Sequence, residues 1–221
     1  MKNIFFMILF AGLILSGCSG GADKTKDSKD ADSTGIAKNN SEVKGRYGLK
    51  SAIIFMKSKT MGMEQDLVMY FDDYGAKQMT EITVEVMGMK SQTIALQDGD
   101  YMYTIDMKTK TGTKTKLEKS GPDNVNFQQL TDEVIKKFNI KKAGTGEVAG
   151  RTCEKFTMEV ADSKMTGTYF IWKGIPLKTE ASIGGISVSM EVTRIDENAA
   201  IAAEKFKIPA GVKIVETAEG K

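Results

Sequence analysis

Apolar and polar residues alternate with a period of two along most of the chain after residue 45. Leu67 and Phe71 lie on one side of such a stretch, and Ile82 and Val84 alternate with Glu81 and other polar residues. Further stretches of this kind lie at residues 94–96, 101–107, 156–160, 168–172, 177–183 and 186–192. This period is typical of antiparallel strands with one covered face and one face in water. We expect about nine to eleven strands in a single curved antiparallel sheet or half-open β-barrel.

Glycine and aspartate mark the breaks between these stretches. Residues 73–75, 97–100, 111–112 and 184–185 are expected turns. Met61-Gly62-Met63 and Met87-Gly88-Met89 each fall between two strands, which predicts two successive hairpins of similar build. The glycine-rich residues 143–150 lack the spacing of a phosphate loop and are interpreted as a flexible link into the next strand. Lysines in residues 108–116 are expected to protect an edge strand.

One stretch has the periodicity of a helix. Phe127, Leu130, Val134 and Phe138 recur at spacings of three and four. Acidic residues come early in residues 127–138 and lysines late, which suits the helix dipole, with Asp123 or Asn124 as the expected cap. We expect this short amphipathic helix to cover, as a lid, an apolar face that the sheet leaves open.

The amino terminus predicts export. A single lysine precedes an apolar run from Ile4 to Leu15, and twelve helical residues span roughly 18 Å. That is shorter than the roughly 30 Å hydrocarbon core of a bilayer, so residues 1–17 are a signal peptide and not a membrane span. Leu15-Ser16-Gly17-Cys18 resembles the bacterial lipobox, with an ordinary secretory signal and a chance cysteine as the alternative. The resemblance implies that Cys18 carries a lipid and starts the mature protein.

The lipobox resemblance divides the chain into three parts. Residues 18–44 contain interleaved lysines and acids with few large apolar residues, so we expect a flexible tether. Residues 45–221 are long enough for a single antiparallel β domain. In the enterobacterial sorting rule an aspartate after the lipid-bearing cysteine retains a lipoprotein at the inner membrane. Ser19 therefore favours the outer membrane, on the periplasmic side of the cell envelope.

Composition argues against several function classes. Removing residues 1–17 deletes one lysine and leaves 30 basic and 29 acidic residues, a balance that gives no reason to expect a nucleic-acid partner. The chain has no histidine, so the usual general base near neutral pH and the commonest transition-metal ligand are missing. We expect no enzyme activity and no cofactor.

The second cysteine, Cys153, has no intrachain disulfide partner if Cys18 is lipidated. A lone thiol in an exported protein is either a reactive site or a small buried apolar residue. Its neighbours alternate like a strand, which favours burial.

Landmarks beyond the lipobox resemble a known group. Residues 150–156 (GRTCEKF), 172–178 (WKGIPLK) and 206–211 (FKIPAG) follow the strand meander and the helix in a set order. This order resembles exported proteins related to the lipoprotein carriers of the Lol pathway, including a related domain of undefined function. The resemblance implies a curved antiparallel sheet whose concave apolar face, covered by helices, holds acyl chains.

The resemblance and the apolar pattern together predict a hydrophobic ligand such as acyl chains, including those of lipoproteins, in the concave face. Methionine suits a surface that must fit variable alkyl chains, although core filling is the alternative for these side chains. The candidate ligand-binding residues are Met69, Phe71, Met107, Phe127, Leu130, Val134, Phe138, Met158 and Trp172.

Two other functions stay open. The first is an interaction or scaffold domain with a filled core that binds envelope partners. The second is Cu(I) binding by the methionine pairs Met61, Met63 and Met87, Met89, because thioether sulfur is a soft ligand and no histidine competes.

Overall fold

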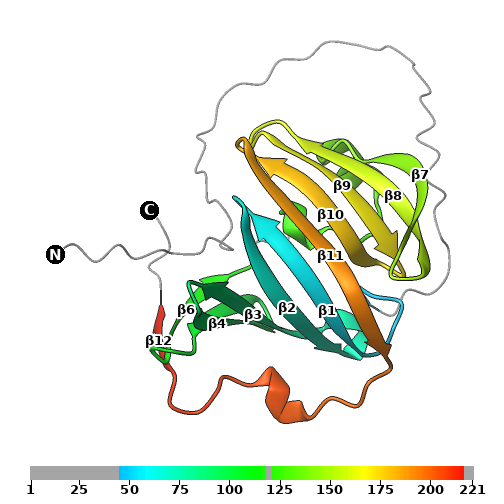
Figure 1. The fold of residues 1–221 in the computed structure, drawn as a ribbon. Coiled ribbons are helices and arrows are strands. Elements are labelled where there is room, and N and C mark those ends of the chain that lie inside the picture. The colour runs from blue at the N-terminus through cyan, green and yellow to red at the C-terminus, as the bar shows by residue number, and fades with distance from the viewer. Residues whose placement is uncertain (1–44, 118–120, 217–221) are drawn as a thin grey trace, which may run out of the picture. The chain divides into compact units, whose positions relative to one another are not determined.

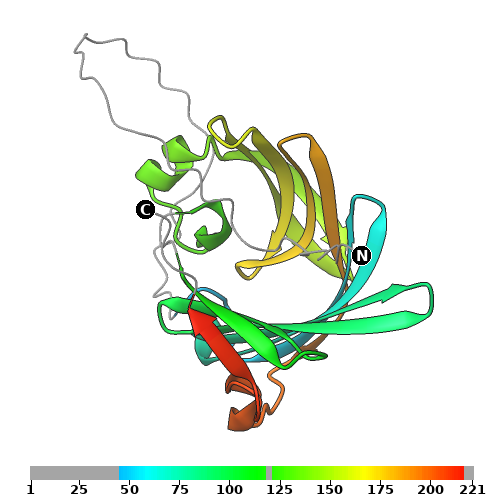
Figure 2. The ribbon, with the colours of Figure 1, turned by 90° about the vertical axis from the view of Figure 1, so that its left-hand side faces the viewer.

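Residues 45–117 and 121–216 are described by the computed structural model, so the predicted signal peptide, lipidated Cys18 and tether lie outside the described residues. The described chain is mainly β, with one large curved open sheet of 12 strands (Figure 1). The order across it is β12-β6-β5-β4-β3-β2-β1-β11-β10-β9-β8-β7. The sheet is not closed, since β7 and β12 are its two edges. Figure 2 shows its curvature from the side.

The elements have the following bounds. The first six strands are β1 (Ala52–Thr60), β2 (Met63–Asp72), β3 (Lys77–Val86), β4 (Met89–Asp98), β5 (Tyr101–Asp106) and β6 (Thr111–Lys116). The last six are β7 (Lys141–Val148), β8 (Arg151–Val160), β9 (Met165–Trp172), β10 (Ile175–Ile183), β11 (Ile186–Glu197) and β12 (Lys213–Glu216). The helical segments are η1 (Asp73–Gly75), η2 (Pro122–Asn124), α1 (Asp132–Lys137) and η3 (Ala203–Phe206).

The predicted single antiparallel sheet is confirmed, with three corrections. Residues 143–150 are not a link: most of them belong to β7, an edge strand with an irregular register against β8. Thr111 and Gly112 are not a turn but begin β6. Strand β6 is not an edge, because β12 from the far end of the chain pairs with it in parallel. The methionine–glycine turns at residues 61–62 and 87–88 are confirmed as hairpins.

Apolar side chains are buried on both faces of the sheet, at different places. Ile82 and Met79 lie on opposite faces of β3, because they are an odd number of residues apart along the strand. Each is buried in a different cluster. Ile82 joins the central cluster with Ile54 and Phe71, whereas Met79 joins a cluster that Phe206 and other C-terminal residues cover. We expected the same face of the sheet to be covered throughout. Instead, one face is covered in one part of the sheet and the opposite face in another.

The predicted helix is shorter than its apolar pattern. Only six residues, Asp132–Lys137, form α1, and Phe127 lies before it. The cap is Thr131, whose side chain accepts a hydrogen bond from the amide of Val134. A third cluster of buried side chains lies between the segment from Val125 to Ile140 and strands β8 and β9.

The described residues belong to one compact unit. Within residues 45–117 and 121–216, no helix is both long and apolar enough to cross a membrane.

Candidate functional site

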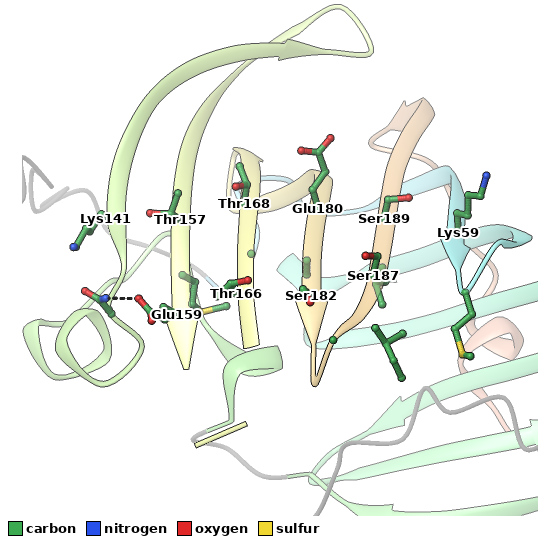
Figure 3. Close-up of a pocket in the computed structure, with 18 of the residues that line it drawn as sticks. Lys59, Lys141, Thr157, Glu159, Thr166, Thr168, Glu180, Ser182, Ser187 and Ser189 are labelled. Atoms are coloured by element: carbon green, nitrogen blue, oxygen red, sulfur yellow. Dashed lines mark hydrogen bonds between the residues drawn. The ribbon is translucent and has the colours of Figure 1, made fainter. Parts of the chain in front are cut away.

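An open groove crosses β7, β8, β9, β10, β11 and the end of β1. Its volume is about 1050 Å³. Figure 3 shows the polar side chains of these neighbouring strands on one face. This groove is the main candidate site, and we call it the hydroxyl groove because serine and threonine predominate among its polar side chains.

Strand register arranges the groove residues in two rows. Antiparallel pairing places directly paired residues on the same face, with their side chains side by side. The first row runs from β7 to β1 through paired residues, as Figure 3 shows, and consists of Lys141, Thr157, Thr168, Glu180, Ser189 and Lys59. The second row lies two residues away from the first on β8, β9, β10 and β11 and consists of Glu159, Thr166, Ser182 and Ser187.

Hydrogen bonds and ion pairs fix the positions of charged side chains in the groove. Asn139 donates a hydrogen bond of 3.1 Å to Glu159 at one end. Glu180 lines the groove, and beside it, outside the lining, the Nζ of Lys178 lies 3.1 Å from Glu180 and 3.3 Å from Glu191. Hydrogen bonds from Lys178 to Glu180 and Glu191 raise the pKa of the amine above its ordinary value.

The groove is chemically suited to hydrogen bonding. Each serine or threonine hydroxyl can donate one hydrogen bond and accept others. Carboxylates accept, and ammonium groups donate. In the described part of the chain there is no group of three or more His, Cys, Asp or Glu side chains that could hold a metal ion.

The space beneath the helical segment is occupied by side chains. Phe138 is 4% exposed and Met158 is 3% exposed. The ring of Phe127 lies 5.5 Å from that of Phe156 and 5.9 Å from that of Tyr169, measured between centroids. Leu130 and Val134 pack against the same cluster. The structure therefore brings five of the nine candidate ligand-binding residues together, as packed core.

The other four candidates lie elsewhere in the sheet. Met69 and Phe71 are buried in the central cluster, and Trp172 packs against its margin. Met107 packs against the separate cluster under the C-terminal segment. The nine candidates are thus divided among three clusters, and only Met158 also lines the hydroxyl groove.

The remaining sequence candidates have distinct surroundings. Cys153 is fully buried, and burial raises the pKa of its thiol. Met61 is exposed at the β1–β2 turn, and Met87 and Met89 are exposed at the β3–β4 turn. Met63 begins β2 and is partly buried. Cys18 lies outside the described residues.

Two buried polar atoms have no hydrogen-bond partner within the described residues. They are the Oγ of Ser58 and the Oε1 of Gln65, on side chains that are 3% and 4% exposed. Ser58 and Gln65 are paired across β1 and β2, on the same face as the buried Met56 and Leu67. A buried polar atom without a partner is costly, so this pair is a second place where a ligand could contribute a hydrogen bond.

Sequence reasoning missed the hydroxyl groove because it treated alternating polar positions only as the solvent face. A signal was present, since Thr166 and Thr168 recur at two-residue spacing, as do Ser187 and Ser189. Small hydroxyl residues at that spacing on neighbouring strands leave room above the sheet, where long charged side chains would fill it. Finding the groove also required the register between strands, which the sequence does not contain.

Comparison with known proteins bears on the fold. No protein-family model matches the chain, and no curated protein matches it in sequence. It is similar to an uncharacterized conserved protein from Thermus thermophilus, with 8% identity and a TM-score of 0.53 over 77% of this chain and 93% of that one.

Two further solved structures are similar to this chain. One is the MucA/MucB complex of Pseudomonas aeruginosa, with 13% identity and a TM-score of 0.48 over 76% of this chain and 59% of the other. The other is the lipoprotein LppX of Mycobacterium tuberculosis, with 12% identity and a TM-score of 0.41 over 70% and 91%. At these identities the likeness concerns the fold alone.

Proposed function

We propose that this chain is a non-catalytic binding domain, anchored in the bacterial cell envelope through Cys18, whose hydroxyl groove binds an extended segment of a partner polypeptide. The observation that carries the proposal is the groove itself. It is open, crosses six strands and is lined by hydroxyl and charged groups together with apolar side chains such as Met158 and Ile186, whereas the space beneath α1 is filled by side chains. The resemblance of residues 15–18 to a lipobox and the predicted signal peptide support the envelope location.

A polypeptide matches the groove in size and polarity. At about 1050 Å³ it lies at the upper end of the range for small-molecule sites, roughly 300–1,000 Å³, and it is open along its length. An extended backbone presents N–H and C=O groups. A serine or threonine hydroxyl can accept a hydrogen bond from the N–H and donate one to the C=O. Lys59, Glu159 and Glu180 add charges that can select side chains of opposite sign. The absence of histidine supports a role without acid–base chemistry.

The groove proposal is tested by selecting peptides that bind the full mature protein from a random display library. Variants Thr168→Trp and Ser187→Trp place a large ring in the groove, and we expect at least a tenfold loss of affinity for the selected peptides. Ser91→Trp, at an exposed serine on β4 outside the groove, is the matched control and should bind normally. Equal affinity in all four proteins, or no enriched peptides, would overturn the proposal.

A hydrophobic ligand such as an acyl chain is the second candidate function. The observation that favours it is the Ser58–Gln65 pair, whose unpaired oxygens lie among apolar side chains and could hold the polar end of an amphipathic molecule. Native mass spectrometry of the purified protein and uptake of a fluorescent fatty acid test this function. Bound lipid that is lost in Gln65→Leu would support it, and a protein without lipid or uptake would exclude it.

A further inference from the structure

One end of the hydroxyl groove is apolar. Met61 and Ile186 line the groove there, and they are 72% and 44% exposed. Gly62 and Gly185 line the same end, and a Cβ added to either glycine would meet no atom within 4 Å. Exposed apolar side chains that lie together are typical of a surface that contacts a partner. This end of the groove therefore has room for a large apolar side chain.

Strand register connects the apolar end to Glu159. Figure 3 shows the second row of the groove, which runs through the paired residues Glu159, Thr166, Ser182 and Ser187. On the other side of β11, the pairing with β1 ends at Val188 and Thr60. Ser187 and Met61 come next on these two strands, so they lie close together. The row therefore leads from a carboxylate, past three hydroxyls, to the apolar end.

The two ends of this row are separated by the length of a short peptide. Neighbouring strands are about 4.8 Å apart, so Glu159 on β8 is three spacings, or roughly 14 Å, from Ile186 on β11. Met61 lies next to β11 at the end of β1, one spacing further, or roughly 19 Å from Glu159. An extended chain rises about 3.3 Å per residue, so about four to six residues cover this distance.

Glu159 has a charge that the fold leaves available. Glu180, the other carboxylate that lines the groove, lies 3.1 Å from the ammonium group of Lys178, whereas Glu159 has no ion pair within the described residues. The hydrogen bond from Asn139 holds the carboxylate of Glu159 in place and adds no positive charge. A group that is already held in place loses less conformational entropy when it binds a partner. Glu159 is therefore suited to bind a basic side chain.

We infer that the partner segment carries a large apolar side chain, which contacts Met61 and Ile186, and a lysine or arginine about four to six residues away, which pairs with Glu159. The hydroxyls between these two ends bind the backbone of the segment and place no demand on its side chains. This inference rests on the proposed function and adds to it the sequence pattern of the partner.

The first test is selection of peptides from the random display library by the full mature protein and, separately, by Glu159→Lys. We expect the peptides selected by the parent to share an apolar and a basic residue at this separation. Those selected by Glu159→Lys should carry aspartate or glutamate at the basic position. A change in the preferred charge is a result that a purely structural role of Glu159 would not produce.

The second test measures the affinity of the selected peptides, as synthetic fluorescent copies, for single variants. Glu159→Gln and Met61→Ser should each lower the affinity by roughly tenfold or more. Lys141→Gln removes a charge from the same end of the groove as Glu159, so it is the matched control and should not weaken binding. Thermal melting of each variant checks that it is folded.

The outcomes separate this inference from the proposed function. If no peptide is enriched, the proposed function fails and the inference fails with it. If the selected peptides lose affinity for Thr168→Trp but bind Glu159→Gln as they bind the parent, the groove binds a polypeptide and the inference is overturned. Selected peptides that share no apolar and basic residue would overturn it as well.

Discussion

At the scale of single residues, burial has made Cys153 part of the core. Its side chain is fully buried, and its pKa lies above the ordinary thiol value of 9.0, mainly because burial penalises the thiolate. The thiolate is the form that reacts with electrophiles. We therefore expect Cys153 in the folded protein to react with a maleimide at pH 7.5 at least a hundredfold more slowly than in urea. Mass spectrometry of the cysteine-containing peptide measures both rates, and comparable rates would show that the site is open to solvent.

The buried hydroxyl of Tyr47 makes the stability of the folded protein depend on pH. Its hydroxyl donates a hydrogen bond of 3.0 Å to Gln78, and its ring centroid lies 4.7 Å from that of Phe71. Burial raises the pKa of Tyr47 above its ordinary value of 10.0, with a smaller opposing effect from Arg46. The pKa of Cys153 is raised as well.

The folded protein should therefore become less stable at alkaline pH. For groups with a raised pKa in the folded state, the unfolded chain loses its protons first as the pH rises. The stabilising contribution is present below the unfolded pKa values of Cys153 and Tyr47 and is lost as the pH rises through their higher folded values. We expect the urea midpoint to fall above about pH 9, and to fall less between pH 10 and 11 in Tyr47→Phe. A midpoint independent of pH from 8 to 11 would contradict this.

At the scale of elements, the alternation of apolar and polar residues is sufficient to predict most strands. It does not predict which residues of neighbouring strands are paired. Strands such as β2 and β11 carry the period of two in their own residues. Strand β7 was missed because Gly144 and Gly146 weaken the pattern, and Gly146 faces Phe170, leaving no room for a side chain. Strand β12 was missed because its parallel partner β6 lies about a hundred residues earlier in the chain.

The helix illustrates the same limit. Spacings of three and four correctly predicted that Phe127, Leu130, Val134 and Phe138 pack on one cluster. They did not predict where the helix begins, because an extended segment can also direct Phe127 and Leu130 towards the core. The beginning depends on Thr131, whose Oγ1 lies 3.3 Å from the amide nitrogen of Val134.

Removing this cap should destabilise the segment over β8 and β9. Thr131→Ala leaves a helix amide without its acceptor, and we expect a loss of about 1 kcal/mol in the free energy of unfolding. Thr131→Ser keeps the hydroxyl and should lose less. Urea denaturation followed by the fluorescence of Trp172 measures both variants. Equal stability of the parent and Thr131→Ala would mean that the six-residue helix is held by its apolar contacts alone.

At the scale of the whole molecule, the described chain begins at the end of the sheet opposite the methionine turns. The amide of Tyr47 donates a hydrogen bond of 3.0 Å to the carbonyl of Tyr74, just past the end of β2, whereas the turn at Met61 and Gly62 precedes β2. A ten-residue strand such as β2 is roughly 33 Å long. The 27 residues from Cys18 to Lys44 could span at most about 90 Å when fully extended. An anchor at Cys18 would thus allow the methionine turns to face towards the membrane or away from it.

Substitution of Cys18 tests whether the protein is anchored in the membrane by a lipid. Cys18→Ser removes the thiol to which a lipid would attach, and we expect the variant to incorporate no labelled palmitate and to leave the membrane fraction for the soluble fraction. The parent should be labelled and should require detergent for release. One acyl chain alone binds membranes weakly, so stable attachment needs the several chains that a lipobox cysteine receives. Cys153→Ser is the matched control, since its buried thiol is not expected to accept a lipid, and it should remain in the membrane. Retention of Cys18→Ser in the membrane fraction would show that another part of the chain holds the protein there.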